Sequence, residues 1–186
     1  MPKFTNKPNN TALFYICDIN VITRHMTNIL GIAGSLRLNS HSTRALKLVL
    51  EKAATKYASE TNLIDLREVE LPIYNPNISS ENDKILTYVT REVIKADSYV
   101  LASPDYHGSM SGAMKNLLDY YWKEFAGKTF GYIVASHEKG LTVMDQMRTA
   151  VYVNVTVGAC RMGYLFTGTT ISMRVAILKI VHYLPD

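Results

Sequence analysis

The stretch NILGIAGSLRLNSHSTRALKLVLEKA, which covers residues 28–53, decides the fold. It opens with a short apolar run, NILGIA, of the kind that forms a buried strand, and the run ends at a Gly-Ser pair. A polar loop comes next, and apolar residues then recur at positions 45, 46, 49, 50 and 53, which is the spacing of one helix face. We therefore predict a strand, a loop and a helix over residues 42–56, the beginning of an α/β unit.

The same alternation continues along the chain. Apolar runs predict strands at residues 61–66, 98–104 and 129–136, and amphipathic segments predict helices at residues 82–96, 111–122 and 142–151. Each strand is a nearly continuous apolar run, which is typical of a parallel sheet covered by helices on both faces. Ligands bind such sheets at the carboxyl ends of the strands. The loops after the first, third and fourth strands are therefore the candidate site.

Composition restricts the class of protein. A chain of 186 residues that is 47% hydrophobic can form the core of one ordinary domain, which excludes disorder. Its net charge of +4 is thinly spread, so we expect no nucleic-acid partner. Cys17 and Cys160 stand far apart without metal-ligand spacing, and no apolar run is long enough to cross a membrane. We expect a cytoplasmic protein with no metal site and no membrane partner.

The loop after the first strand, residues 34–42, collects hydroxyl groups and one cation at the start of a helix. Ser35, Ser40 and Ser42 supply the hydroxyls, and Arg37 supplies a guanidinium. Together with the N–H groups of a first helical turn, these are the groups that bind a phosphate dianion. The alternative is a plain turn in which Ser40 or Ser42 only caps the helix. The sequence leaves both interpretations open.

The loop after the third strand is the second candidate. Pro104, Tyr106, His107 and Gly108 stand at the mouth of a buried strand, where an aromatic ring and backbone N–H groups can face a planar ligand. His107 is the only histidine placed where chemistry is expected, and we expect it to contact a ligand without acting as an acid or base. No GxGxxG, P-loop or GxSxG motif is complete, and we expect no catalytic side chain.

Two motifs carry a resemblance to a known family. GSLRLNSHS after the first strand and SPDYHGSMSGAMKNLLD after the third resemble the NADPH-dependent FMN reductases, which include flavin, azo, quinone and chromate reductases; the resemblance covers about residues 28–151. It implies a flavodoxin-like three-layer sandwich whose parallel sheet has the strand order 2-1-3-4-5. It also implies FMN as cofactor, with the phosphate held by Ser35, Arg37, Ser40 and Ser42.

The same resemblance implies the residues along the flavin. Pro104, Tyr106, His107 and Gly108 match the loop that lies against the ring and the ribityl chain. A third loop, after the fourth strand, closes over the ring in that family, which implicates Ser136 and His137. This chain has His137 and Glu138 where many members have a pair of glycines.

The function that the resemblance implies is an FMN-dependent NAD(P)H oxidoreductase. NADPH, the co-substrate, passes a hydride to the flavin, and a small acceptor such as a flavin, quinone, azo compound or metal oxyanion then takes the electrons. A flavodoxin-type electron carrier and an inactive remnant of the reductase are the alternatives. Members commonly form homodimers or tetramers, and the candidate contact residues, which core packing explains equally well, are Leu117, Leu118, Tyr120, Tyr121 and Trp122.

The two ends of the chain do not follow this pattern. Residues 1–25 lack periodicity, and we expect a disordered extension or a misassigned start before Met26. Residues 26–151 form the expected FMN-binding domain. After Val151 the resemblance stops, so we expect residues 152–186 to be an atypical segment in which the last strand and helix are altered or missing. Our hypothesis is a reading-frame shift near Tyr152, and a divergent C-terminus is the alternative.

Overall fold

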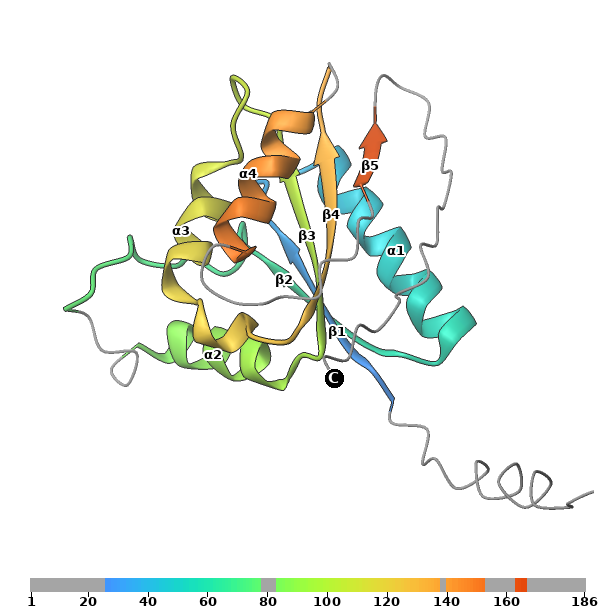
Figure 1. The fold of residues 1–186 in the computed structure, drawn as a ribbon, viewed down its shortest axis with the longest axis horizontal. Helices are drawn as coiled ribbons and strands as arrows, with labels where there is room; N and C mark the ends of the chain where they lie inside the picture. Colours follow the sequence, from blue (N-terminus) through green and yellow to red (C-terminus); the bar gives the residue numbers. More distant parts are fainter. Residues whose placement is uncertain (1–25, 78–82, 138–139, 153–162, 167–186) are drawn as a thin grey trace, which may run out of the picture.

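The computed structural model describes residues 26–77, 83–137, 140–152 and, as backbone, 163–166. Strands and helices alternate along the chain, as the sequence predicts (Figure 1). The elements are β1 Asn28–Ala33, α1 His41–Tyr57, β2 Glu60–Asp65, α2 Lys84–Lys95, β3 Ser98–Pro104, α3 Gly112–Tyr120, the 3-10 helix η3 Lys123–Phe125, β4 Thr129–Ala135, α4 Leu141–Tyr152 and β5 Gly163–Phe166. The helix predicted over residues 111–122 is shorter than expected, because it ends at Tyr120 and η3 follows.

The strands form one sheet in the order β2-β1-β3-β4-β5, and every neighbouring pair is parallel. This confirms the predicted flavodoxin-like order. The fifth strand is present but has only 4 residues, and it pairs Gly163 with Tyr132 and Phe166 with Ala135. Since all strands point the same way, their carboxyl ends and the loops that follow gather at one edge of the sheet, at the top of Figure 1.

Helices cover the sheet on both faces, which makes three layers (Figure 1). α2, α3 and α4 lie on one face and α1 lies on the other. The larger core cluster lies under α2, α3 and α4, and the smaller one lies under α1. In β4, Tyr132 belongs to the larger cluster and the next residue, Ile133, to the smaller one, because neighbouring strand residues point to opposite faces. On the α1 face, Ile29 and Val100 are only partly buried.

An aromatic cluster fixes the base of the larger core. The ring of Tyr99 stacks on Phe130 with 4.7 Å between centroids, and both rings meet Phe125 edge to face at 5.2 Å. The Tyr99 hydroxyl donates a 2.6 Å hydrogen bond to the Val93 carbonyl at the end of α2. Each such ring pair adds roughly 0.5–1.5 kcal/mol to the stabilisation that comes from burial. The helices on this face are therefore anchored well below the loops of the candidate site.

The described residues contain no helix long and apolar enough to span a membrane, and no group of three or more metal-ligating side chains. The leader, residues 1–25, and most of the C-terminal segment lie outside the described residues. The expectations for those two regions therefore stay predictions.

Candidate functional site

The first loop packs closely against the start of α3 at the point where it leaves β1. The Gly34 N–H donates to the Ala102 carbonyl in β3 at 2.8 Å. A β-carbon on Gly34 would stand 2.9 Å from the Cβ of Met114 and 3.0 Å from the Oγ of Ser111, so only glycine fits here without a shift. The close approach places the carboxyl ends of β1 and β3 beside the first turn of α3.

The serines of the first loop surround the start of α1. Ser40 is the N-cap, and its hydroxyl accepts the Thr43 N–H at 3.3 Å. Ser40 therefore caps the helix, and a hydroxyl that accepts this bond can still contact a second partner. The hydroxyl of Ser42 lies 2.9 Å from that of Ser40, and both residues are buried. Ser35 is buried as well, and its hydroxyl accepts the Arg37 N–H at 3.4 Å.

The first turn of α1 has free hydrogen-bonding capacity of the kind that a phosphate uses. Within the part of the chain that the structure describes, the N–H groups of His41 and Ser42 have no partner, as is usual at a helix start. The Thr43 hydroxyl is buried and also lacks a partner among these residues. No acidic side chain stands in this turn. Unpaired N–H groups, buried hydroxyls and the positive end of the helix dipole together fit a phosphate monoester.

The second loop makes a tight two-residue turn. The N–H of Tyr106 donates to the Ser109 carbonyl at 3.0 Å, and the Ser109 N–H donates back to the Tyr106 carbonyl at 3.1 Å. Between them, His107 and Gly108 have φ angles of 57° and 79°, the left-handed pair of a type I′ turn. A positive φ is uncommon for a residue other than glycine, although histidine adopts it more readily than most, and contacts from outside the turn help to hold it.

Asp105 supplies part of that support, and the sequence analysis did not assign it a role. One carboxylate oxygen accepts the Gly108 N–H at 2.8 Å, and the other accepts the Ser136 hydroxyl at 2.7 Å. The Asp105 N–H also donates to the Ala135 carbonyl at 2.9 Å. The carboxylate therefore ties the loop after β3 to the loop after β4.

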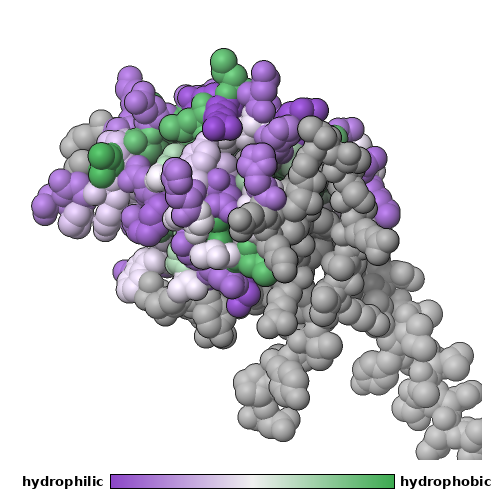
Figure 2. All heavy atoms as spheres, turned by 90° about the horizontal axis from the view of Figure 1, so that it is seen from above, coloured by the Kyte–Doolittle hydropathy of each residue, from purple (hydrophilic) through white to green (hydrophobic). Residues whose placement is uncertain are grey.

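Arg37 joins the first loop to the second. Its guanidinium carbon lies 5.7 Å from the centroid of the Tyr106 ring, within the range of a cation–π contact. Both side chains are exposed at the carboxyl edge of the sheet. Figure 2 looks onto this edge and shows mostly hydrophilic side chains on the described surface, with hydrophobic ones gathered in a few places.

Ser111 connects the same two loops from below. It is the N-cap of α3, and its hydroxyl accepts the Met114 N–H at 3.1 Å while donating a 2.6 Å hydrogen bond to the Gly34 carbonyl. Its own N–H donates to the Ser103 hydroxyl at 3.0 Å. A serine directly before a helical pattern indicates an N-cap, but nothing in the sequence near Ser111 predicts its hydrogen bond to Gly34 in the first loop.

The sequence-predicted residues thus fall into three groups at one edge. Ser35, Ser40 and Ser42 surround the start of α1, Arg37 meets Tyr106, and Ser136 contacts the second loop through Asp105. Pro104 is the buried last residue of β3, whereas His107 and Gly108 are exposed. His137 is exposed too, and no contact in the described part of the chain ties its side chain to the other site residues.

Most of the residues suggested for an oligomer contact are buried in the core. Leu117, Leu118 and Tyr121 are buried under α3, which supports the packing explanation for them. Tyr120 is half-buried, and its hydroxyl donates to the Pro72 carbonyl at 3.0 Å. Trp122 is the exposed member of the set, with 51% of its surface accessible.

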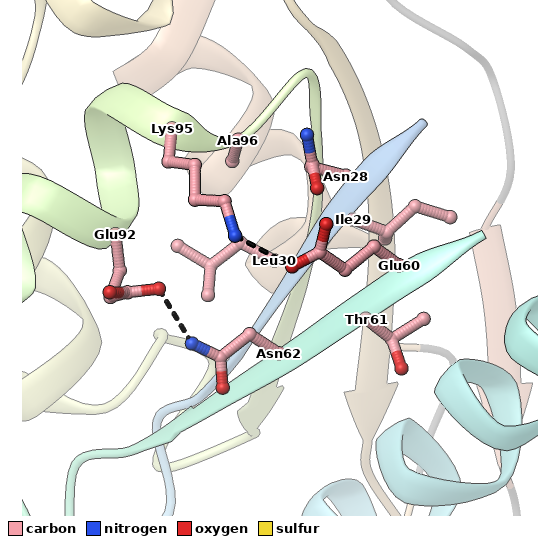
Figure 3. Close-up of a pocket in the computed structure, with 9 residues that line it drawn as sticks. All are labelled: Asn28, Ile29, Leu30, Glu60, Thr61, Asn62, Glu92, Lys95 and Ala96. Atoms are coloured by element: carbon pink, nitrogen blue, oxygen red, sulfur yellow. Dashed lines mark hydrogen bonds and ion pairs between the residues drawn. The ribbon is translucent and has the colours of Figure 1, made fainter. Parts of the chain in front are cut away.

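A shallow hollow of about 110 Å³ lies at the opposite edge, among the starts of β1 and β2 and the end of α2 (Figure 3). Its polar side chains largely satisfy one another. Lys95 donates to Glu60 at 2.6 Å, and Asn62 donates to Glu92 at 2.7 Å. The hydrogen bond and charge of Glu60 raise the pKa of Lys95. The hollow is therefore separate from the candidate site, and it lies at the edge where the strands begin, whereas ligands of parallel sheets bind at the carboxyl edge.

Comparison with known proteins gives the class. Residues 27–167 match the model of the NADPH-dependent FMN reductase family, and the chain belongs to that family. The match continues beyond Val151, where our sequence analysis ends the resemblance.

Among curated proteins, the chain is 39% identical over 101 residues to an NADPH azoreductase of Bacillus sp. (strain OY1-2). It is 30% identical over 135 residues to an NAD(P)H-dependent FMN reductase of Pseudomonas aeruginosa, and this match covers 68% of this chain and 71% of that protein. The match to the Bacillus azoreductase covers 51% of this chain and 57% of that protein, and the match to the FMN-dependent NADPH-azoreductase of Staphylococcus saprophyticus covers 55% and 56%. The chain therefore spans little more than half the length of these two relatives.

Solved structures share the fold. An apo NADH:FMN oxidoreductase superposes with a TM-score of 0.64 at 20% identity, over 75% of each chain. An azoreductase of Bacillus anthracis superposes with a TM-score of 0.57 at 16% identity, over 77% of this chain and 88% of that one. These similarities establish a flavodoxin-like fold.

Proposed function

We propose that this chain is an FMN-dependent NAD(P)H oxidoreductase. The observation that carries the proposal is the contact between Arg37 and Tyr106, at 5.7 Å. It joins a loop suited to a phosphate to a loop suited to a planar ring, and FMN contains both groups. Family membership of residues 27–167 supports the same cofactor.

The phosphate of FMN is assigned to the start of α1. Ser35, Ser40 and Ser42 offer hydroxyls, the N–H groups of the first turn offer donors, and Arg37 offers positive charge. The partnerless hydroxyl of Thr43 adds one more donor, which the sequence analysis did not include. The chain's role at this end is to bind and orient.

The ring and ribityl chain are assigned to the second and third loops. Pro104, Tyr106, His107 and Gly108 form one wall, and Ser136 and His137 belong to the other. FMN held there would supply the redox chemistry that links NADPH to a small acceptor such as a flavin, quinone, azo compound or metal oxyanion. The chain needs no acid or base for this.

The remaining assignments rest on the family alone. We propose a homodimer or tetramer, in which the exposed Trp122 is the candidate contact. A cytoplasmic location agrees with two cysteines that lack disulfide-framework spacing. The azoreductases among the relatives make an azo compound a suitable acceptor to test.

Reconstitution of the full chain tests the proposal. Purified protein is incubated with FMN, freed of excess cofactor, and assayed for NADPH oxidation with an azo dye or free flavin as acceptor. We expect retained yellow colour and turnover. Yellow protein without turnover contradicts the reductase and indicates a flavodoxin-type carrier. Colourless protein that takes up no FMN indicates an inactive remnant.

A further inference from the structure

Gln146 is the only glutamine in the sequence, and it reaches the second loop from α4. Its side-chain oxygen accepts two hydrogen bonds at 3.0 Å, one from the Ser109 hydroxyl and one from the Met110 N–H. Its side-chain nitrogen donates to the Gly108 carbonyl at 3.4 Å. Two donors face the oxygen and one acceptor faces the nitrogen, so the partners define the orientation of the amide.

These contacts complete the support of the turn. Asp105 holds the Gly108 N–H from the β3 side, and Gln146 holds the carbonyl of the same residue from the α4 side. The turn contains His107 at a φ of 57°, a left-handed conformation that contacts from the surroundings stabilise. Side chains on both flanks of the turn supply that constraint.

We propose that Gln146 is a positioning residue that fixes the Tyr106–Ser109 turn against the flavin. The inference rests on the proposed function, because it assigns the turn to FMN. Gln146 itself is not assigned to the cofactor; it acts through the backbone of Met110 and of Gly108, which is part of the proposed flavin wall. Loss of its hydrogen bonds frees the turn to leave the conformation in which Tyr106 meets Arg37.

Two variants of the full chain test this role. Gln146→Met keeps the length of the side chain and removes all three hydrogen bonds, whereas Gln146→Glu keeps the oxygen acceptors for Ser109 and Met110. Thr149→Val is the matched control, because Thr149 is exposed on the same helix and makes no contact with the turn. FMN is titrated against each protein by fluorescence quenching, and the visible circular dichroism of the bound flavin is recorded.

We expect Gln146→Met to raise the Kd for FMN about tenfold and to change the flavin spectrum, because it loses hydrogen bonds that hold the turn. We expect Gln146→Glu to lose affinity as well, because it keeps an acceptor for Ser109 and Met110 but turns a carboxylate oxygen toward the Gly108 carbonyl. We expect Thr149→Val to match the original protein. Unchanged affinity and spectrum in Gln146→Met overturn the positioning role.

Hydrogen exchange of the Met110 amide, measured without FMN, separates this inference from the proposed function. We expect faster exchange in Gln146→Met than in the original protein, by more than any fall in the thermal midpoint accounts for. If the original protein takes up no FMN, the proposed function fails and the positioning role fails with it, whatever the exchange shows. If the original protein binds FMN and Met110 exchanges equally in both, only the positioning role fails.

Discussion

The guanidinium of Arg37 lies over the ring of Tyr106, 5.7 Å from its centroid, although the two residues belong to loops that follow different strands. β1 and β3 are neighbours in the sheet, so their carboxyl ends deliver these loops to the same place. One side chain therefore stands between the proposed phosphate end and the proposed ring end of the cofactor. Changes at Arg37 are expected to affect both ends.

Arg37→Ala is predicted to weaken FMN binding by about 10- to 100-fold, since a charge-assisted contact is worth roughly 1.5–3 kcal/mol. Arg37→Lys is predicted to recover part of the loss, because lysine keeps the charge without the planar fork. FMN titration at two salt concentrations measures both effects. Arg44→Ala is the control, because it removes the same charge from an exposed position of α1. Equal losses in Arg37→Ala and Arg44→Ala would show that only general charge matters.

Gly34→Ala is predicted to lower the free energy of unfolding by about 1–3 kcal/mol, because its β-carbon would crowd Met114 at 2.9 Å. Gly112→Ala is the matched control. Nothing lies within 4 Å of a β-carbon there, so alanine at the start of α3 is predicted to be neutral or stabilising by up to about 1 kcal/mol. Urea unfolding measures both. Equal midpoints for the two variants would mean that the first loop is not tightly packed on α3.

Asp105→Asn is predicted to lower the free energy of unfolding by about 1 kcal/mol and to weaken FMN binding several-fold. The amide keeps one acceptor oxygen, so it cannot accept from both Gly108 and Ser136. Thermal unfolding and FMN titration measure the two effects. Asp119→Asn, which breaks an exposed ion pair with Lys115, is predicted to change stability by less than about 0.5 kcal/mol. If Asp105→Asn behaves like Asp119→Asn, the Asp105 carboxylate does not support the candidate site.

Alkaline pH is predicted to destabilise the protein through Tyr121. Burial raises the pKa of Tyr121 to about 12, against a hydrogen bond from Thr90 that lowers it. The unfolded chain has a tyrosine pKa of about 10. Because the folded state keeps the proton longer, the stabilising contribution is complete below pH ~10 and disappears as the pH rises through about 12.

Unfolding midpoints followed from pH ~8 to 12 check this, together with the tyrosinate absorbance. Tyr121→Phe removes one ionisable group and is predicted to make the decline shallower. Tyr57→Phe is the control, because Tyr57 is exposed. A decline of the same steepness in Tyr121→Phe as in the original protein would contradict the assignment.

The frame-shift hypothesis for residues after Tyr152 makes a prediction about the gene. Related sequences resemble RQCYGWSLPYG after the segment that matches residues 136–151. Read from the third base of the Tyr152 codon, the codons up to Gly163 must therefore be able to spell RQCYGWSLPYG. Nucleotide sequencing decides the matter, since one incompatible synonymous codon ends the hypothesis. A divergent C-terminus places no such constraint on the codons, so the two explanations differ in their expected codons.

Local periodicity determined the elements of the fold. The apolar runs of β1, β3 and β4 and the helical spacing of α1 follow from burial on the faces of a sheet, and burial leaves a pattern in consecutive residues. The ends of the helices were harder to predict from periodicity. For example, α3 ends at Tyr120 because the chain turns into η3. The sequence could not decide whether Ser40 caps the helix or binds a ligand, since both roles need a hydroxyl at a helix start.

The sequence by itself determined that three loops meet at the carboxyl edge, because a parallel sheet brings all of those ends together. Only the tertiary structure decided which side chains hold the loops in place. Ser111 reaches Gly34 across 77 positions, Ser136 reaches Asp105 across 31, and Gln146 reaches Ser109 across 37. A hydrogen-bond donor carries no mark of a partner that distant, so these pairs exist only once the strands are packed side by side.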